Sequence, residues 1–187
     1  MEVLTLNKKN ITDFAGERNL LLRNAKAGWV LFVDSDEVVS SRLQKEIDQA
    51  VGSGMYDGYY LKRKNFFLGR YVGTDRIIRL AKKNSGRWER EVHETWKVKG
   101  RVGTLNNPLI HNTADNLFDY IKKIDFYSTL HARANRKEGK TASVFKIIVY
   151  PKLKFFQTFF KSHHLVFSLL QAFHSYLSWS KLYFLRS

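Results

Sequence analysis

The chain has 187 residues, a formal net charge of +15 and no cysteine. This length allows one domain with a sizeable core and an appendage. The lack of cysteine excludes disulfide bonds and thiolate metal sites, and it suits a reducing compartment. Because no apolar stretch follows a basic region near the N-terminus, we expect no export signal.

The basic side chains are unevenly distributed along the chain. Residues 1–60 contain 7 basic and 9 acidic side chains, residues 61–138 contain 18 and 8, and residues 139–187 contain 7 basic and no acidic side chains. This excess predicts an anionic partner, which can be nucleic acid, a phosphorylated substrate or anionic lipid. No signature of a known nucleic-acid-binding domain is present, so we expect no nucleic-acid partner.

The first sixty residues alternate between helical and strand patterns. A helix is predicted over residues 14–27, followed by a buried apolar strand over residues 29–33. A second helix follows, capped by Ser40 or Ser41 and ended by Gly52. This succession of helix, buried strand and helix predicts an α/β layer with a mainly parallel sheet.

The middle of the chain has a different pattern. The segments DGYYLKRKNFFLG, RIIRL and ETWKVKGRV predict short strands, the last with a turn at Lys99 and Gly100. Apolar residues then follow helical spacing over residues 116–137, which predicts a long amphipathic helix.

The C-terminal tail, residues 139–187, is rich in aromatic and basic residues. After Pro151, lysines and small polar residues fall on one helical face, and phenylalanines and leucines cover the other. A stretch without charge follows over residues 162–180, but its histidines and serines argue against a membrane span. The pattern favours a segment that lies in a membrane interface. The alternative is that these helices cover the core of the domain itself.

The stretch GWVLFVDSDE places three carboxylates at the end of a buried strand. In open α/β sheets, ligands bind beyond the carboxyl ends of the strands. Asp34 and Asp36, two residues apart around a turn, can approach one hard cation such as Mg²⁺ or Mn²⁺. The alternative is that one carboxylate caps the following helix and the others are solvated. Spacing alone does not decide between these interpretations.

Five motifs in order resemble a known family. They are FAGERNLLLRNAKAGWVLFVDSDEVVSSRL, NFFLGRYV, RIIRL, RWEREVHETW and LIHNT. Together they are similar to family 2 glycosyltransferases of the GT-A fold, particularly the branch that adds glucose-like sugars to lipopolysaccharide cores. The resemblance runs from about residue 14 to residue 137. It implies an α/β fold with a GT-A-like mixed sheet flanked by helices over residues 1–138, and residues 139–187 then form a helical membrane-associating tail.

The resemblance also implies how the donor binds. In this family the last aspartate of the DxD turn binds the divalent metal on the donor diphosphate, which corresponds to Asp36. Asp34 would then contact the donor's ribose, sugar or metal shell. The family's Arg-Asn pair lies near the donor and corresponds to Arg18 and Asn19. The alternative for Arg18 is a surface arginine of the helix.

Transfer with inversion needs a base that accepts the proton of the acceptor hydroxyl. By resemblance to the family's VHE motif, Glu94 is the first candidate and Glu91 the second; the alternative is that both only pair with neighbouring arginines. GT-A enzymes often place a late histidine near the metal or diphosphate, and His111 in LIHNT is the candidate here, although a lone histidine is more often structural. A basic set can meet the diphosphate or a phosphorylated glycolipid: Lys62, Arg63, Lys64, Arg70, Arg76 and Arg79.

These residues imply a metal-dependent inverting glycosyltransferase. It would move a hexose such as glucose from a nucleotide-diphosphate sugar, which we expect to be a UDP-sugar, to a lipopolysaccharide-core or other lipid-linked acceptor. We expect a peripheral protein at the cytoplasmic face of the inner membrane, bound to an anionic surface. The family's first strands would have to precede residue 14, so we expect an N-terminally truncated domain. The alternative is a non-catalytic remnant that binds membranes or polyanions.

Overall fold

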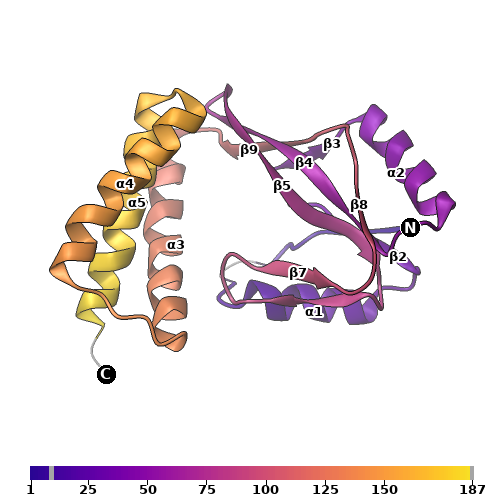
Figure 1. Cartoon of the computed structure of the whole chain (residues 1–187), viewed down its shortest axis with the longest axis horizontal. Helices are drawn as coiled ribbons and strands as arrows, with labels where there is room; N and C mark the ends of the chain where they lie inside the picture. Colours follow the sequence, from indigo (N-terminus) through magenta and orange to yellow (C-terminus); the bar gives the residue numbers. More distant parts are fainter. Residues whose placement is uncertain (9–10, 186–187) are drawn as a thin grey trace. The chain divides into compact units, whose positions relative to one another are not determined.

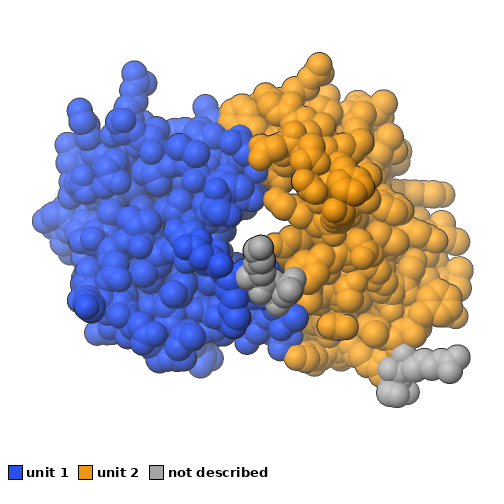
Figure 2. Space-filling model, turned by 180° about the vertical axis from the view of Figure 1, so that it is seen from behind, with its two compact units in different colours: residues 1–65, 74–112 blue, residues 66–73, 113–187 orange. Residues whose placement is uncertain are grey.

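The computed structural model describes residues 1–8 and 11–185. The chain divides into two compact units (Figure 2): unit 1 comprises residues 1–65 and 74–112, and unit 2 comprises residues 66–73 and 113–187. The expected boundary between residues 138 and 139 falls inside unit 2, because the helix before it belongs to the same unit as the tail. Residues 9–10, and residues 186–187 of the tail, lie outside the described residues.

Helices and strands are distributed unequally between the units (Figure 1). The helices are α1 (Phe14–Asn24), α2 (Ser41–Ser53), α3 (Leu117–Lys137), α4 (Val144–Ser162) and α5 (Leu165–Phe184). The strands are β1 (Glu2–Leu4), β2 (Trp29–Phe32), β3 (Glu37–Val39), β4 (Gly58–Phe67), β5 (Arg70–Lys82), β6 (Gly86–Glu89), β7 (Thr95–Val98), β8 (Val102–Thr104) and β9 (Leu109–Ala114).

A mixed seven-stranded sheet has the order β1-β2-β5-β4-β9-β3, with β8 paired to β4. The pairs β1–β2 and β4–β8 are parallel, whereas β2–β5 and β3–β9 are antiparallel. The mixed α/β fold is therefore confirmed, but the expectation of a mainly parallel sheet was wrong. The physical reason is the short link between β4 and β5. Leu68 and Gly69, both with positive φ (48° and 75°), form a hairpin turn too tight for a parallel crossover.

The predicted helices of unit 1 are present, with different ends. Asp13 caps α1 by accepting a hydrogen bond from the amide of Gly16, and α1 stops at Asn24 rather than near residue 27. Ser40 caps α2, and the left-handed residue that ends it is Gly54 (φ 64°) rather than Gly52. The short strand β3, between the expected strand and helix, was not predicted.

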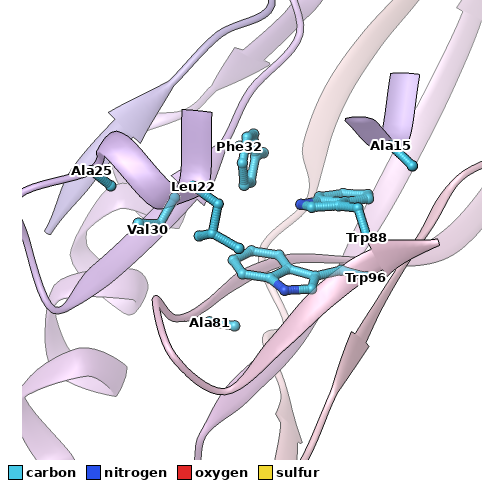
Figure 3. Packing of buried hydrophobic residues seen from close by; sticks show 8 residues of the cluster. All are labelled: Ala15, Leu22, Ala25, Val30, Phe32, Ala81, Trp88 and Trp96. Atoms are coloured by element: carbon cyan, nitrogen blue, oxygen red, sulfur yellow. The ribbon is translucent and has the colours of Figure 1, made fainter. Parts of the chain in front are cut away.

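Two apolar clusters lie in unit 1. On one side, α2 packs through Leu43 and Ile47 onto β2, β4 and β9. On the other, α1 packs with the β6–β7 hairpin onto β2 (Figure 3). Trp88 and Trp96 stack there with ring centroids 5.4 Å apart, and each meets Phe32 edge-on. The second cluster fixes α1 and the segment after β6 close to the end of β2.

Unit 2 is mainly helical. The long helix expected over residues 116–137 is confirmed as α3, with Asn116 as its cap. α5 packs against both α3 and α4 (Figure 1). The core is formed by Phe67, Val72, Ala114, Tyr120 and Ile124, with Phe167, Leu170 and Leu177 of α5. Within residues 1–8 and 11–185, no helix combines the length and apolarity needed to span a membrane.

Candidate active site

The turn after β2 carries the three carboxylates. It is closed by a hydrogen bond from the amide of Glu37 to the carbonyl of Asp34 (2.9 Å), and the Glu37 carboxylate accepts from the amide of Asp34 (3.0 Å). The Glu37 side chain is fully buried. None of the three carboxylates caps α2, because Ser40 does so. Glu37 thus stabilises the turn through its own amide and carboxylate, and the side chains of Asp34 and Asp36 contact other partners.

Arg18 of α1 joins Asp34 to Glu94. Its Nη2 donates to both oxygens of Asp34 (2.7 and 3.0 Å), and its Nε donates to Oε1 of Glu94 (2.9 Å). Arg18 is only 2% exposed, so the interpretation as a surface arginine was wrong. One guanidinium therefore holds the DxD turn and the candidate base on either side of itself.

The ion pairs continue from Asp34 into the sheet. Arg79 of β5 donates to Asp34 (2.6 Å) and approaches Glu37 (3.5 Å). Arg63 of β4 donates to Glu37 (3.1 Å) and holds Asp75 through two hydrogen bonds (2.8 and 3.1 Å). Three arginines and four carboxylates thus form one chain of pairs. Arg63 and Arg79 of the predicted basic set belong to it.

Aromatic rings help to accommodate the buried arginines. The guanidinium carbons of Arg18 and Arg79 lie 4.8 and 5.6 Å from the ring centroid of Trp88. Nη1 of Arg18 and of Arg79 has no hydrogen-bond partner in the described structure, and a ring face is a favourable neighbour for such a cationic surface. Burial together with the nearby Arg18 lowers the pKa of Arg79.

The carboxyl of Asp34 is held in its charged form. Burial by itself would raise its pKa, but the charges of Arg79 and Arg18 outweigh burial, and the pKa lies below its usual value. Both oxygens accept hydrogen bonds from arginine. Two arginines thus stabilise the charged carboxylate of Asp34. Its assignment as a residue that binds the donor or the metal stays a prediction.

Asn19, the neighbour of Arg18, contacts the main chain of β6. Its Nδ2 donates to the carbonyl of Trp88 and its Oδ1 accepts from the amide of Trp88, both at 2.9 Å. This paired contact continues the hydrogen bonding of a strand edge and ties α1 to β6. The geometry indicates a structural role for Asn19, and the expected donor contact stays a prediction.

The segment between β6 and β7 holds both candidate bases. Arg90 and His93 have positive φ (73° and 55°), which non-glycine residues adopt at a cost. The carbonyl of Glu91 accepts from the amide of Phe14 at the start of α1 (3.0 Å), so the segment is anchored there. Glu94 is half-buried and faces Arg18, whereas the main chain of Glu91 serves as the anchor.

β9 brings His111 to the DxD turn. The register of β3 and β9 places His111 opposite Glu37, and the amide of Asn112 donates to the carbonyl of Asp36 (2.9 Å). Nε2 of His111 lies 3.6 Å from Oδ2 of Asp36. Nδ1 of His111 lies 2.7 Å from Oδ1 of Asn65, which orients the ring.

This pair can supply part of a metal site. No group of three or more His, Cys, Asp or Glu side chains that could hold a metal was found among the described residues. Asp36 and His111 provide one carboxylate and one imidazole, and an ion bound there would take its remaining oxygens from a substrate diphosphate and water. A carboxylate suits Mg²⁺ and Mn²⁺, while imidazole favours Mn²⁺ over Mg²⁺. The donor set fits such an ion.

Comparisons with known proteins point to one class of enzyme. No protein-family model matches the chain. The chain is 25% identical over 158 residues to the lipopolysaccharide core biosynthesis glycosyltransferase LpsC of Rhizobium meliloti, covering 80% of this chain and 58% of LpsC. It is 24% identical to an uncharacterized glycosyltransferase of Rickettsia conorii, covering 90% of this chain and 69% of that one. The chain is a distant relative of glycosyltransferases.

A solved structure of TarS residues 1–349 from S. aureus, in complex with UDP, was also found. The similarity has a TM-score of 0.41 and 12% identity, and it covers 97% of this chain and 75% of that one. The distant relationship to glycosyltransferases therefore depends on the sequence matches. In the match to LpsC, this chain spans about three fifths of the length of LpsC.

Sequence reasoning missed two acidic members of the site. The sequence places Glu37 with Asp34 and Asp36 in a group that could bind a cation or cap a helix. In the structure, Glu37 instead pairs with Arg63 and Arg79 inside the fold. Asp75 was not singled out at all. One signal was available: Arg63 and Arg79 stand in segments predicted as strands, where a charged residue among apolar neighbours requires a buried partner.

Proposed function

We propose that the chain is a metal-dependent inverting glycosyltransferase that uses a nucleotide-diphosphate sugar. One observation carries the proposal: Arg18 holds Asp34 of the DxD turn and Glu94 at the same time, and Asp36 of the same turn lies next to His111. A candidate base and a candidate metal pair are thereby gathered around one strand end. The distant relationship to glycosyltransferases supports this assignment.

Glu94 acts as the base in the proposed reaction. It accepts the proton of an acceptor hydroxyl, and the hydroxyl oxygen forms a bond to the anomeric carbon on the face opposite the diphosphate. The bond between that carbon and the diphosphate oxygen breaks, and its electron pair leaves with the diphosphate. Arg18 keeps Glu94 in place through the hydrogen bond to Oε1, so that Arg18 is a positioning residue.

Asp36 and His111 would hold a divalent ion, Mn²⁺ or Mg²⁺, which would bind the donor together with these two side chains. When bound, the ion neutralises the charge that develops on the leaving group. Asn65 orients the imidazole of His111, and Arg79 and Arg18 keep the Asp34 carboxylate charged and fixed beside the turn. We take the donor to be a UDP-hexose such as UDP-glucose and the acceptor to be a lipopolysaccharide-core or other lipid-linked saccharide.

A second function is favoured by the basic tail, whose residues 139–187 contain no acidic side chain. It is binding to a membrane or polyanion without catalysis. Titration calorimetry of the full chain with UDP-glucose and Mn²⁺ separates the two functions. Metal-dependent heat, followed by transfer of labelled glucose to lipid-linked core saccharide, supports the enzyme; no heat with UDP-glucose in the presence of Mn²⁺ contradicts it.

A further inference from the structure

The last two helices expose many apolar side chains, although α5 packs some of its apolar residues against the core of unit 2. On α4 and α5 thirteen such residues are between 43% and 75% exposed: Val144, Phe145, Ile148, Leu153, Phe156, Phe160, Leu165, Val166, Leu169, Phe173, Tyr176, Tyr183 and Phe184. An amphipathic helix of a water-soluble fold normally turns its apolar side toward a core. Contiguous exposed apolar surface indicates a site of contact with a partner or a membrane.

Three small polar residues of these helices are buried. Thr158 of α4 is buried, as are Ser168 and Ser178 of α5. The hydroxyls of the two serines donate to carbonyls of their own helix, four residues back, at His164 and His174 (both 2.8 Å). These hydroxyls are thus satisfied without water. α5 also packs Phe167, Leu170 and Leu177 against the core of unit 2, so the alternative that the tail helices cover the core holds for this side of α5. The other side of α5 and much of α4 leave apolar side chains exposed.

The exposed residues of α4 form one surface. Phe145, Ile148, Lys152, Phe156 and Phe160 follow each other at steps of three or four residues, so they share one side of the helix. Lys152 and Lys161 are exposed beside the aromatic rings. Lys154 is half-buried, and burial lowers its pKa. We call the five residues at these steps the α4 face.

The positive charge of the tail favours an anionic lipid surface over a second copy of this chain as the partner of the α4 face. Residues 139–187 contain seven basic and no acidic side chains. A second copy of this chain would bring the same positive charge against the α4 face, which opposes self-association. An anionic lipid surface offers negative headgroups to the lysines and acyl chains to the phenylalanines.

We propose that α4 and α5 lie in the headgroup region of an anionic phospholipid bilayer, with the phenylalanines of the α4 face inserted at the acyl boundary. This inference goes beyond the proposed transfer reaction, because it depends on the surface of unit 2 and on no residue of the candidate active site. The two are therefore tested separately.

The test is sedimentation of the full chain with vesicles of phosphatidylcholine, with or without phosphatidylglycerol. The wild-type chain is expected to bind the mixed vesicles. Replacement of Phe145, Phe156 and Phe160 together by serine is expected to weaken binding on the order of 100-fold. Lys152→Glu with Lys161→Glu is expected to weaken it about tenfold or more, and only where phosphatidylglycerol is present.

A matched control replaces three exposed apolar residues of unit 1, Val3, Leu20 and Met55, by serine. These are 54%, 46% and 57% exposed, so exposed apolar surface is lost here too, but vesicle binding should be unchanged. Circular dichroism verifies that all variants fold. The proposal is overturned if the wild-type chain does not bind mixed vesicles, or if the phenylalanine variant binds like wild type. It is also overturned if sedimentation velocity shows a dimer that the phenylalanine variant dissociates.

Discussion

Arg18 and Asp34, sixteen residues apart, are joined by hydrogen bonds from one guanidinium nitrogen to both carboxylate oxygens at 2.7 and 3.0 Å. Arg18 is buried, and its Nε donates to Glu94. Because the two carboxylates depend on the same cation, a change at Arg18 alters both the DxD turn and the candidate base. The stability of the fold and the proposed chemistry are therefore coupled at this residue.

We expect Arg18→Met to destabilise the fold by about 3–5 kcal/mol, because Glu94 would lose its paired cation and Asp34 would keep only Arg79. Arg18→Lys keeps the charge but cannot reach both carboxylates through a planar fork, so it should fall between Arg18→Met and wild type. Urea unfolding of both variants measures the difference. Arg23→Met, at the exposed end of α1, is the control and should change the free energy of unfolding by less than about 0.5 kcal/mol.

The effect of Asp34→Asn on stability should depend on pH. The folded-state pKa of Asp34 is lowered, so its contribution to stability is fully present above the unfolded pKa and is lost as the pH falls through the folded pKa. The variant should therefore be less stable than wild type at pH 7, and the difference should shrink as the pH falls below the ordinary range of an aspartate. Urea unfolding across the acid range measures it, and a difference independent of pH would exclude this role.

Glu94→Gln should keep donor binding and stop sugar transfer. Loss of a general base typically costs about 10²- to 10⁴-fold in rate. Calorimetry with UDP-glucose and Mn²⁺ measures binding, and transfer of labelled glucose measures turnover. Glu89→Gln serves as the control, since this exposed glutamate pairs with Arg87 on the surface. Wild-type turnover in Glu94→Gln would remove Glu94 as the base and direct attention to Glu91.

Asp36→Ala and His111→Ala should each abolish metal-dependent binding of the nucleotide sugar. The two side chains are the proposed ligands of the ion, and the diphosphate supplies further oxygens. The spectrum of Mn²⁺ in paramagnetic resonance, with UDP present, reports the bound ion independently of turnover. Asp48→Ala, on the exposed side of α2, is the control. Retention of the bound-ion signal in both variants would contradict the metal assignment.

Asn19→Ala should destabilise the contact between α1 and β6. It removes two hydrogen bonds to the main chain of Trp88 and leaves a buried amide without its partner, which costs about 2–3 kcal/mol. Leu20→Ala, an exposed neighbour on α1, is the control. If unfolding is unchanged but donor affinity falls, Asn19 contacts the donor as the family resemblance implies.

Local patterns were sufficient for the elements that lead to the site. The apolar run before Asp34, the capping serine at Ser40 or Ser41 and the spacing within α3 each predict conformation from neighbours in sequence, and the structure has the corresponding strand and helices. The ends of helices were predicted less well. At the end of α2, the sequence does not distinguish Gly52 from Gly54 as the glycine that adopts the left-handed conformation.

The partner of each carboxylate could not be derived in this way. Arg79 lies 45 residues from Asp34, and Arg63 lies 26 from Glu37. Their meeting depends on the strand order and on the hairpin between β4 and β5. The short strand β3 has no periodic signal, yet its register with β9 brings His111 to Asp36.

The sequence by itself determined that a buried strand ends in a carboxylate turn, that helices flank it, and that the tail is basic and amphipathic. Only the tertiary structure decided that Glu37 is structural, that Arg18 joins Asp34 to Glu94, and that α4 exposes Phe145, Phe156 and Phe160. The physical reason is that periodicity reports which side chains share a face, whereas long-range pairing decides which face is buried and which charges meet.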